Sequence, residues 1–317
     1  MMKQLKIYIA GHNGMVGSAI WNNLQMNGYV NLIGRNSKEL DLKNQASVYT
    51  FFELEKPDIV IDAAARVGGI LANDSYPYQF IMENMQIQNN LIDAAHKNNV
   101  QKFIFLGSSC IYPKLAEQPI KEEYLLTDSL EPTNEWYAIA KISGVKVCEA
   151  IRKQFNKDFL SLMPTNLYGE RDNFDLQSSH VLPAMIRKFH DAKENGNAPV
   201  TLWGTGKPMR EFLHVNDLAE AVRFTLENTL PDSLYNVGTG VDLTIRELAE
   251  TVQKIVGHTG KVIWDSSKPD GTPKKQLNID KIKLEGWKPK ISLNEGIKKT
   301  YLWFLENTEN IKEVKIL

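Results

Sequence analysis

The chain has 317 residues, enough to bury a large hydrophobic core in one big domain or two closely packed domains. Its 37 lysines and arginines balance 38 aspartates and glutamates, and this formal net charge of -1 gives no electrostatic reason to expect nucleic acid or a membrane surface as partner. No apolar run approaches the roughly 20 residues of a membrane-spanning helix. The amino terminus runs directly into the strand-like residues 5–10, which leaves no room for a signal peptide.

The cysteine content favours a reducing compartment. Cys110 and Cys148 are the two cysteines of the chain, and neither belongs to a pattern with metal-ligand spacing. We therefore expect two free thiols, no disulfide framework and no metal site, in a cytoplasmic protein.

A glycine-rich loop follows the first predicted strand, at residues 6–10, and precedes a helical pattern. In this order the glycines let the backbone approach a pyrophosphate, and the N–H groups at the helix amino terminus stabilise its charge. The spacing is G-x-x-G-x-x-G, which differs from the commoner G-x-G-x-x-G fingerprint. The sequence thus predicts a dinucleotide-binding loop made of Gly11, His12, Asn13, Gly14, Met15, Val16 and Gly17.

The residues after a short second strand, predicted at 32–34, bear on the choice between NAD and NADP. No carboxylate that could bind the ribose 2′-hydroxyl of NAD occurs before Glu39. Arg35 would suit a 2′-phosphate and favours NADP, although a solvated loop charge would look the same in the sequence. Asp41 and Leu42 follow where the adenine edge could be contacted.

Strands and helices then alternate along the chain. A helix is predicted at 44–55, a strand at 58–65, a long helix at 78–98 and a strand at 103–107. This alternation predicts an α/β fold with a doubly wound, Rossmann-like parallel sheet. The loop at 66–70 follows a strand, and ligands bind at the carboxyl ends of strands in such sheets.

Residues 108–141 carry side chains that suit proton transfer to a ketone. Tyr137 and Lys141 share one face of a predicted helix, where the ammonium could hold the phenol oxygen and favour its deprotonation. Ser108, at a strand end, could bind a carbonyl oxygen. Cys110 would point the same way as Ser108 if the chain is still extended there. An ordinary tyrosine with a lysine neighbour has the same spacing, so this pattern alone leaves both interpretations open.

Composition shifts beyond residue 168 toward polar residues, glycine and proline, which predicts a second, smaller α+β domain. We expect a dinucleotide-binding domain at 1–168, with a return of the chain near 211–240, and a substrate domain at 169–317. Within the return, the strand at 211–215 is expected to rejoin the sheet, and residues 235–240 to complete the second lobe.

Longer motifs cover nearly the whole chain. They are Gly107-Ser-Ser-Cys-Ile-Tyr-Pro113, Glu131-Pro-Thr-Asn134, Met163-Pro-Thr-Asn-Leu-Tyr-Gly169, Asp172-Asn-Phe174, Pro208-Met-Arg-Glu-Phe-Leu-His214 and Lys268-Pro-Asp-Gly-Thr-Pro273. Together with the glycine loop they resemble the extended short-chain dehydrogenase/reductases acting on nucleotide sugars, and among these the GDP-L-fucose synthase family. The resemblance implies a homodimer that uses NADPH to convert GDP-4-keto-6-deoxy-D-mannose into GDP-L-fucose, with residues 169–317 binding the GDP-sugar.

The resemblance also implies catalytic roles. A ketone at C4 acidifies the protons on C3 and C5, and the family pattern makes Cys110 the base and His180 the acid that epimerise these carbons. For the reduction of C4, Tyr137 would protonate the forming alkoxide, Ser108 would hold it and Lys141 would lower the phenol pKa. Without the resemblance, His180 could equally be a histidine satisfied by the backbone of a polar loop.

Ligand contacts follow from the same resemblance. Besides the glycine loop and Ser108, the implied cofactor contacts are Ser37, Asp41, Leu42, Leu106, Gly107, Ser109, Lys141, Pro164, Thr165, Asn166, Leu167 and His180, which add to Arg35. The positions that match GDP-sugar contacts are Lys188, Trp203, Arg210 and Asp270. Some family members have arginines at the positions of Asn13, Ser37 and Lys188. At the last of these, the lysine of this chain binds phosphate less specifically than an arginine would.

Two alternatives remain open in the sequence. A C4 reductase of a related GDP-4-keto sugar, such as a heptose, would keep the fold, the cofactor and the hydride step but would not epimerise, and the intact Cys110 and His180 argue against it. A non-catalytic NADP-binding sensor would be expected to lack part of the acid–base set, none of which is missing here.

Overall fold

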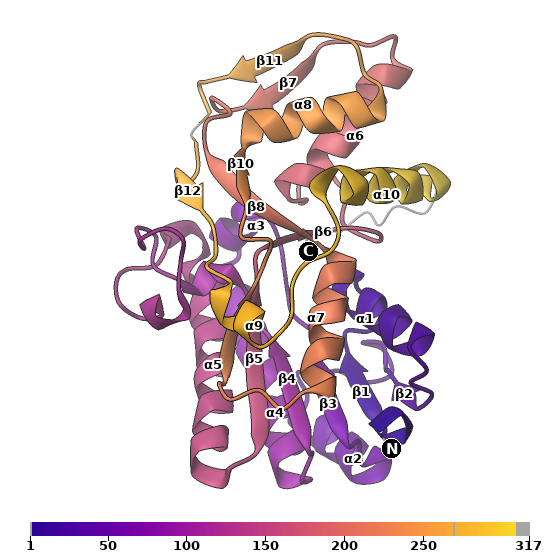
Figure 1. Ribbon diagram of the computed structural model, residues 1–317, viewed down its shortest axis with the longest axis vertical. Helices are drawn as coiled ribbons and strands as arrows, with labels where there is room; N and C mark the ends of the chain where they lie inside the picture. Colours follow the sequence, from indigo (N-terminus) through magenta and orange to yellow (C-terminus); the bar gives the residue numbers. More distant parts are fainter. Residues whose placement is uncertain (1, 269, 309–317) are drawn as a thin grey trace.

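The computed structural model describes residues 2–268 and 270–308. Pro269, in the 268–273 motif, and residues 309–317 of the predicted substrate domain lie outside the described part. The polypeptide forms two lobes stacked along the long axis of the molecule (Figure 1). The larger lobe contains a six-stranded sheet with the order β2-β1-β3-β4-β5-β9, and every pair in it is parallel. This confirms the predicted doubly wound sheet.

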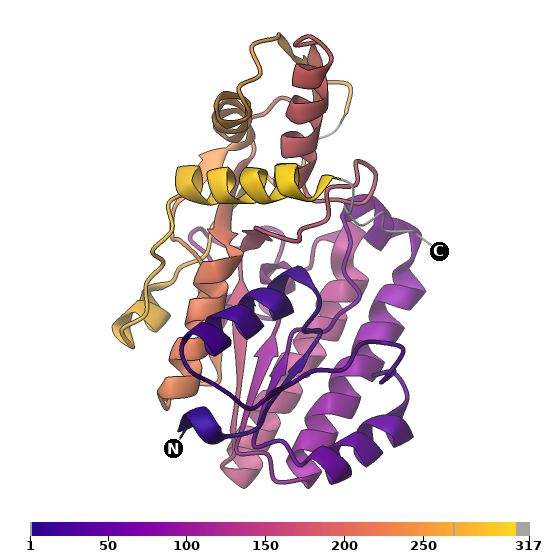
Figure 2. The same cartoon turned by 90° about the vertical axis from the view of Figure 1, so that its right-hand side faces the viewer.

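Apolar strands and amphipathic helices build the larger lobe. Its strands are β1 (Ile7–Ala10), β2 (Leu32–Ile33), β3 (Ile59–Asp62), β4 (Lys102–Leu106), β5 (Asp158–Pro164) and β9 (Leu234–Val237). Its helices are α1 (Met15–Met26), α2 (Gln45–Glu55), α3 (Ile70–Ser75), α4 (Pro77–Lys97), α5 (Glu135–Phe155) and α7 (Val215–Glu227), with short 3-10 turns η1 (Met2–Gln4), η2 (Ser109–Ile111), η3 (Glu122–Tyr124) and η4 (Pro132–Asn134). Helix α4 packs against α2 and α5, and α1 packs against α7 on the other side of the sheet (Figure 2).

Coverage by helices on both faces explains the composition of the central strands. Every residue of β1, β3 and β4 is buried, and each strand is a nearly continuous apolar run rather than an alternating one. These strands contribute to one large hydrophobic cluster together with residues of the flanking helices.

The smaller lobe is organised around β8. Its strands are β6 (Asn166–Tyr168), β7 (Val200–Trp203), β8 (Met209–His214), β10 (Asp242–Thr244), β11 (Val262–Asp265) and β12 (Lys274–Lys275), and its helices are α6 (Val181–Glu194), α8 (Ile245–Val256) and α10 (Leu293–Glu306). Helix α9 (Asp280–Leu284) follows β12 and packs against β9 of the larger lobe. Strand β8 pairs with β6, β10 and β12, whereas β7 pairs with β11. A second hydrophobic cluster lies here, between α6, α8 and α10.

The return of the chain to the large sheet differs from our expectation. Residues 211–215 do not rejoin it, because most of them belong to β8 in the smaller lobe, and β9 is the returning strand. Tyr235 and Val237 on β9 are fully buried in the larger cluster, as are the later residues Leu277 and Ile282. Two separate clusters support the predicted domain boundary near residue 168, which stays a prediction.

One buried carboxylate links these segments. Glu211 on β8 has no solvent exposure. Its side chain accepts hydrogen bonds from the backbone N–H groups of Thr239 (2.6 Å) and Gly240 (2.8 Å), after β9, and of Leu277 (2.8 Å). Glu211 therefore fixes the central strand of the smaller lobe to segments that lead into the larger core.

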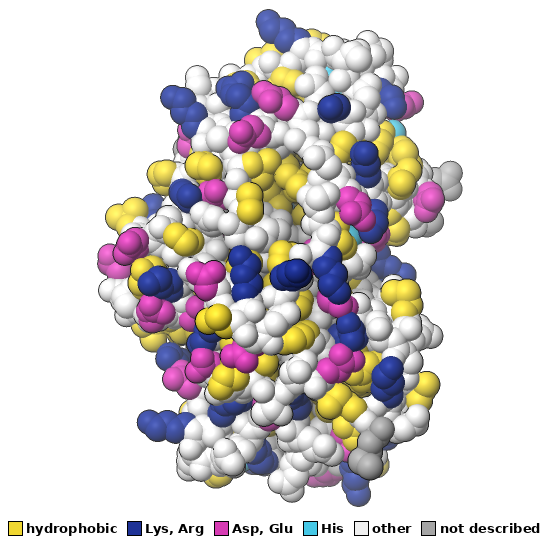
Figure 3. Space-filling view, viewed as in Figure 1, with side chains coloured by type: hydrophobic (Ala, Val, Ile, Leu, Met, Phe, Trp, Pro, Cys, Tyr) yellow, Lys and Arg dark blue, Asp and Glu magenta, His cyan; other side chains and the backbone are white. Residues whose placement is uncertain are grey.

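Charges are mixed on the molecular surface. Figure 3 shows lysine and arginine side chains interspersed with aspartate and glutamate over the face seen in Figure 1. The distribution agrees with the near-zero net charge of the chain.

Candidate active site

The predicted cofactor residues gather at one edge of the large sheet. Because its strands are parallel, their carboxyl ends lie at the same edge, which faces the smaller lobe (Figure 1). The glycine loop follows β1, residues 35–42 follow β2, residues 107–109 follow β4 and residues 164–167 extend from the end of β5 into β6. The structure thus brings together segments that are far apart in the sequence, at the place where open α/β sheets bind ligands.

The glycine loop has the geometry of a phosphate cradle. Gly11 has a φ of +77°, a conformation that favours glycine. A Cβ added at Gly17 would lie 2.2 Å from the carbonyl oxygen of Gly11, so the loop and the first turn of α1 touch through bare backbone. Gly14 caps α1 without a side-chain hydrogen bond, which leaves the amino-terminal N–H groups available to an anion. These features fit the pyrophosphate of a dinucleotide.

Replacing Gly17 with alanine is expected to weaken binding of NADPH about tenfold or more, because the new methyl group forces the loop away from α1. Titration of NADPH against the change in protein fluorescence measures this. Gly14→Ala is the matched control in the same loop, since its Cβ would lie 3.4 Å from the Gly11 carbonyl oxygen, an ordinary contact. Equal affinities of the two variants would contradict the proposed cradle.

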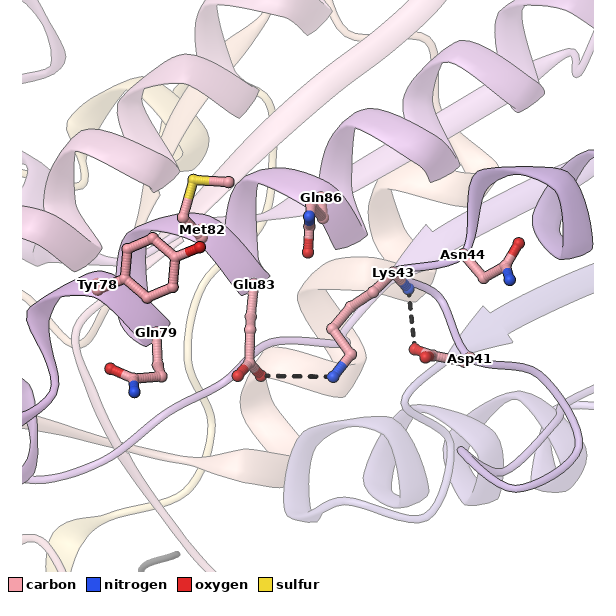
Figure 4. Close-up of a pocket in the computed structure, with 8 residues that line it drawn as sticks. All are labelled: Asp41, Lys43, Asn44, Tyr78, Gln79, Met82, Glu83 and Gln86. Atoms are coloured by element: carbon pink, nitrogen blue, oxygen red, sulfur yellow. Dashed lines mark hydrogen bonds and ion pairs between the residues drawn. The ribbon is translucent and has the colours of Figure 1, made fainter.

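The predicted adenosine end lies beside two shallow pockets. Arg35 lines one of them, and its guanidinium contacts the Glu55 carboxylate at 2.6 Å. Asp41 lines the other, where its carboxylate accepts the N–H of Lys43 and the Lys43 ammonium faces Glu83 at 3.9 Å (Figure 4). The role of Arg35 toward a 2′-phosphate stays a prediction, and in this structure its charge is already paired.

Helix α5 carries the predicted phenol and amine, but their arrangement differs from our expectation. The Lys141 ammonium donates a hydrogen bond to the Leu106 carbonyl oxygen at 2.9 Å, and lies 5.9 Å from the centroid of the Tyr137 ring rather than on the phenol oxygen. Burial raises the pKa of Tyr137, and the nearby Cys110 and Asp62 raise it further. The phenol is therefore held in its protonated form, opposite to the predicted direction.

Cys110 lies near Ser108, although the chain is not extended there. Residues 109–111 form the 3-10 turn η2, and the Ser108 hydroxyl accepts the backbone N–H of Cys110 at 3.3 Å. The condition for the two side chains to point the same way, an extended chain, is therefore not met, because the serine at the strand end caps a turn. Cys110 is 7% exposed, and burial raises the pKa of its thiol while the positive charge of Lys275 lowers it.

His180 belongs to the smaller lobe, at the amino-terminal cap of α6. His180 as a whole residue is exposed, yet the surrounding protein desolvates its imidazole and lowers its pKa. The loop before it contacts the larger lobe, because the Gly69 N–H donates to the Ser178 carbonyl oxygen at 3.3 Å. His180 therefore stands at the junction of the two lobes.

The predicted sugar contacts cluster around β7 and β8. Trp203 is 68% exposed and not a core indole, and the Lys188 ammonium lies 5.9 Å from its ring centroid. Arg210 donates to the carbonyl oxygens of Met209 and Thr272. Asp270 accepts hydrogen bonds from the N–H and hydroxyl of Thr205, which lower its pKa.

Two charged residues near the site were not singled out from the sequence. Lys275 on β12 is the register partner of Arg210 on β8 and lowers the pKa of Cys110. Its position just after the 268–273 motif could have indicated that Lys275 lies near the site. Asp62 ends β3 and is completely buried. Nothing in its sequence neighbourhood distinguishes it from an ordinary polar residue at a strand end.

Neither a metal centre nor a membrane span is found in the described residues. Over residues 2–268 and 270–308, histidine, cysteine and acidic side chains form no cluster that could hold a metal ion. Within the same ranges, no helix is long and apolar enough to cross a membrane.

Comparison with known proteins agrees with this geometry. Residues 7–238 match the NAD dependent epimerase/dehydratase family. The chain belongs to this family. Among its relatives, it is 56% identical to GDP-L-fucose synthase 1 of Arabidopsis thaliana over 97% of this chain and 95% of that protein. It is also 52% identical to the GDP-L-fucose synthase of Escherichia coli, over 98% of this chain and all of that protein.

A solved structure has a similar fold. It is the GDP-mannoheptose C4 reductase from Campylobacter jejuni with NADP bound, with a TM-score of 0.89 and 40% identity over 96% of this chain and 99% of that chain. These similarities confirm the resemblance to nucleotide-sugar enzymes of the GDP-L-fucose synthase group.

Proposed function

We propose that this protein is an NADPH-dependent epimerase/reductase that converts GDP-4-keto-6-deoxy-D-mannose into GDP-L-fucose. The observation that carries the proposal is the identity of more than half of the chain, over nearly its full length, to GDP-L-fucose synthases. The intact acid–base set supports it, and its members are Ser108, Cys110, Tyr137, Lys141 and His180.

Cys110 and His180 would perform the epimerisation. The C4 ketone acidifies the C3 and C5 protons, so the Cys110 sulfur can take a proton from carbon while the electron pair moves toward the ketone oxygen. The Lys275 charge favours the thiolate that this step needs. His180 returns a proton to the opposite face of the carbon. Because desolvation lowers its pKa, its protonated form is a stronger acid than a free imidazolium.

Tyr137 would act as the acid of the reduction. NADPH, when bound, supplies the hydride that adds to C4. The Tyr137 hydroxyl gives its proton to the C4 oxygen, and the Ser108 hydroxyl holds that oxygen. A raised phenol pKa suits this role, because it keeps the proton on Tyr137 until the alkoxide forms. Lys141, buried beside the ring, stabilises the phenolate left behind.

The remaining ligand contacts follow the same scheme. Lys188 and Arg210 would bind the diphosphate of the GDP-sugar. Trp203 and Asp270 would contact other parts of the same molecule, and the exposed indole of Trp203 supports its role. NADP as the cofactor is supported by the missing carboxylate after β2 and by the NADP in a related structure. The glycine loop and the segments after β2, β4 and β5 would hold it.

Isotope exchange tests the proposal. When GDP-4-keto-6-deoxy-D-mannose and NADPH react with the protein in D₂O, we expect deuterium at C3 and C5 of the product. Cys110→Ser should reduce label uptake about tenfold or more, because a hydroxyl is a far weaker base than a thiolate. Mass spectrometry of the GDP-sugar measures the label, and Cys148→Ser, which alters the other buried thiol, is the control.

The second candidate function is a C4 reductase of a related GDP-4-keto sugar, such as a heptose, without epimerisation. The similarity to the GDP-mannoheptose C4 reductase favours it. Reduction of such a sugar, with no label entering GDP-4-keto-6-deoxy-D-mannose, would replace the first proposal with this one.

The assembly and the compartment are also inferred. Apolar side chains are exposed on adjoining helices, including Tyr78 and Met82 on α4 and Trp136 and Phe155 on α5, which supports a homodimer formed through these helices. The two free thiols support a reducing compartment, the cytoplasm. A dinucleotide-binding domain at 1–168 and a GDP-sugar domain at 169–317 remain our proposed division.

A further inference from the structure

Asp62 is a buried carboxylate that the scheme above does not use. It is the last residue of β3 and has no solvent exposure. One carboxylate oxygen accepts the backbone N–H of Ala64 at 3.1 Å, whereas Oδ2 has no hydrogen-bond partner among the described residues. Burying an incompletely paired carboxylate is costly, so its presence at a ligand-binding edge calls for a compensating charge.

The register of the sheet identifies the neighbour of Asp62. Asp62 pairs with Phe105 on β4, and paired residues of adjacent parallel strands project from the same face of a sheet. The Lys141 ammonium lies 4.6 Å from the centroid of the Phe105 ring. Asp62 and Lys141 therefore occupy the same buried layer between the sheet and α5.

This layer is tightly packed and buried. Lys141 is 2% exposed, and among the described residues the acceptor of its ammonium is the Leu106 carbonyl oxygen. An ammonium has three donors, so this charge is only partly satisfied. One turn further along α5, a Cβ at Gly144 would lie 2.5 Å from the Phe105 ring, which shows how closely the helix approaches the sheet. Charges interact strongly in such a medium even without direct contact.

We propose that Asp62 is a positioning residue whose carboxylate supplies the counter-charge that keeps the Lys141 ammonium charged beside Tyr137. The inference rests on the proposed reductase function, because Lys141 acts there through Tyr137. A neutral lysine would no longer stabilise the phenolate after proton transfer.

The electrostatics of both groups agree with this assignment. Burial lowers the pKa of Lys141, and the negative charge of Asp62 is the larger of the opposing influences, ahead of Cys110. Burial raises the pKa of Asp62 to about 6, and Lys141 lowers it.

The other titratable groups near the pair have pKa values raised by burial. They are Tyr8 on β1, Cys110 in η2, and Tyr137 and Cys148 on α5. The positive charge of Lys275 lowers the pKa of Cys110. A carboxylate with a pKa of about 6 is ionised at pH 7, so Asp62 is the anion that faces Lys141 under these conditions.

Lysine titration in the full chain tests the proposal without any substrate. In protein carrying ¹³Cε-lysine, the Lys141 resonance is assigned by its loss in Lys141→Met. Replacing Asp62 with the isosteric asparagine should lower the Lys141 pKa by about 1 pH unit or more. Cys148→Ala is the matched control, because it removes a buried, uncharged group from the same helix and should leave that pKa unchanged. An unchanged Lys141 pKa in folded Asp62→Asn would overturn the proposal.

Activity supplies the second readout. The pH at which NADPH oxidation declines on the alkaline side should move downward in Asp62→Asn by the same amount as the Lys141 pKa, and should not move in Cys148→Ala. A loss of rate with an unshifted pH profile would mean a merely structural role. If no GDP-4-keto sugar is reduced, the proposed function fails, and the lysine titration still decides the role of Asp62.

The reciprocal variant covers the case in which Asp62→Asn does not fold. In Lys141→Met, the Asp62 carboxyl loses its positive neighbour, so its pKa should rise above about 6, measured by ¹³C NMR of labelled aspartate. If the Asp62 pKa in Lys141→Met equals that in the parent protein, the two charges are not coupled and the proposal is refuted.

Discussion

Replacing Tyr137 with phenylalanine is expected to slow hydride transfer about 10²- to 10⁴-fold, the range in which a positioned general acid contributes. In the proposed reduction the hydroxyl is the proton source for the C4 oxygen, and burial holds its pKa high, so it is fully protonated at neutral pH. The ring itself packs edge to face on Phe80, and phenylalanine keeps that contact. Stopped-flow absorbance of NADPH at saturating substrate measures the step.

Cofactor binding should survive the Tyr137 replacement, because the glycine loop and the segments after β2 and β4 are untouched. Tyr49→Phe is the matched control, since it removes a hydroxyl that contacts Asp93 away from the sheet edge. If Tyr137→Phe turns over at the rate of the parent protein, Tyr137 is not the acid. That result would favour the alternative of a non-catalytic NADP-binding sensor.

Glu211→Ala is expected to produce the largest loss of stability, about 3–5 kcal/mol. The change removes the acceptor for the N–H groups of Thr239, Gly240 and Leu277, and each buried donor left unpaired costs about 1–3 kcal/mol. Water that enters the space left by the side chain can accept some of these hydrogen bonds, which offsets part of the loss of stability. Urea denaturation followed by tryptophan fluorescence gives the free energy of unfolding.

The control for Glu211 is Glu149→Ala on α5. The Glu149 carboxylate pairs with Lys146 at 2.7 Å on the surface, and such exposed pairs contribute about 0–1 kcal/mol. A loss at Glu211 no larger than at Glu149 would show that the backbone N–H groups find other partners.

Local patterns were enough to predict much of the fold. The apolar run of β1, the glycine loop and the helix after it are adjacent in sequence, so their order alone indicated the dinucleotide-binding unit, and the spacing of Tyr137 and Lys141 placed both on α5. The sequence could not show whether β8 or β9 is the returning strand, because both are short and their pairing depends on partners far away in the chain.

Several details of the candidate site could not be predicted from the sequence for the same physical reason. The pairing of Arg35 with Glu55 joins a loop to the far end of α2, and the approach of Asp62 to Lys141 depends on the β3–β4 register and on how closely α5 packs. The turn at Cys110 was missed because a strand end and a serine-capped turn begin with the same residues. Long-range contacts of this kind leave no periodic signal.

The bond between the Gly69 N–H and the Ser178 carbonyl oxygen carries a stereochemical consequence. In the proposed epimerisation, the Cys110 sulfur that would remove the proton lies in the larger lobe, and the His180 imidazole that would return it lies in the smaller lobe. A small hinge rotation would therefore change the reach of His180 to the carbon without changing that of Cys110. A sugar deprotonated while the lobes stand apart would regain its proton from the face that lost it, so inversion of configuration depends on closure as well as on acidity.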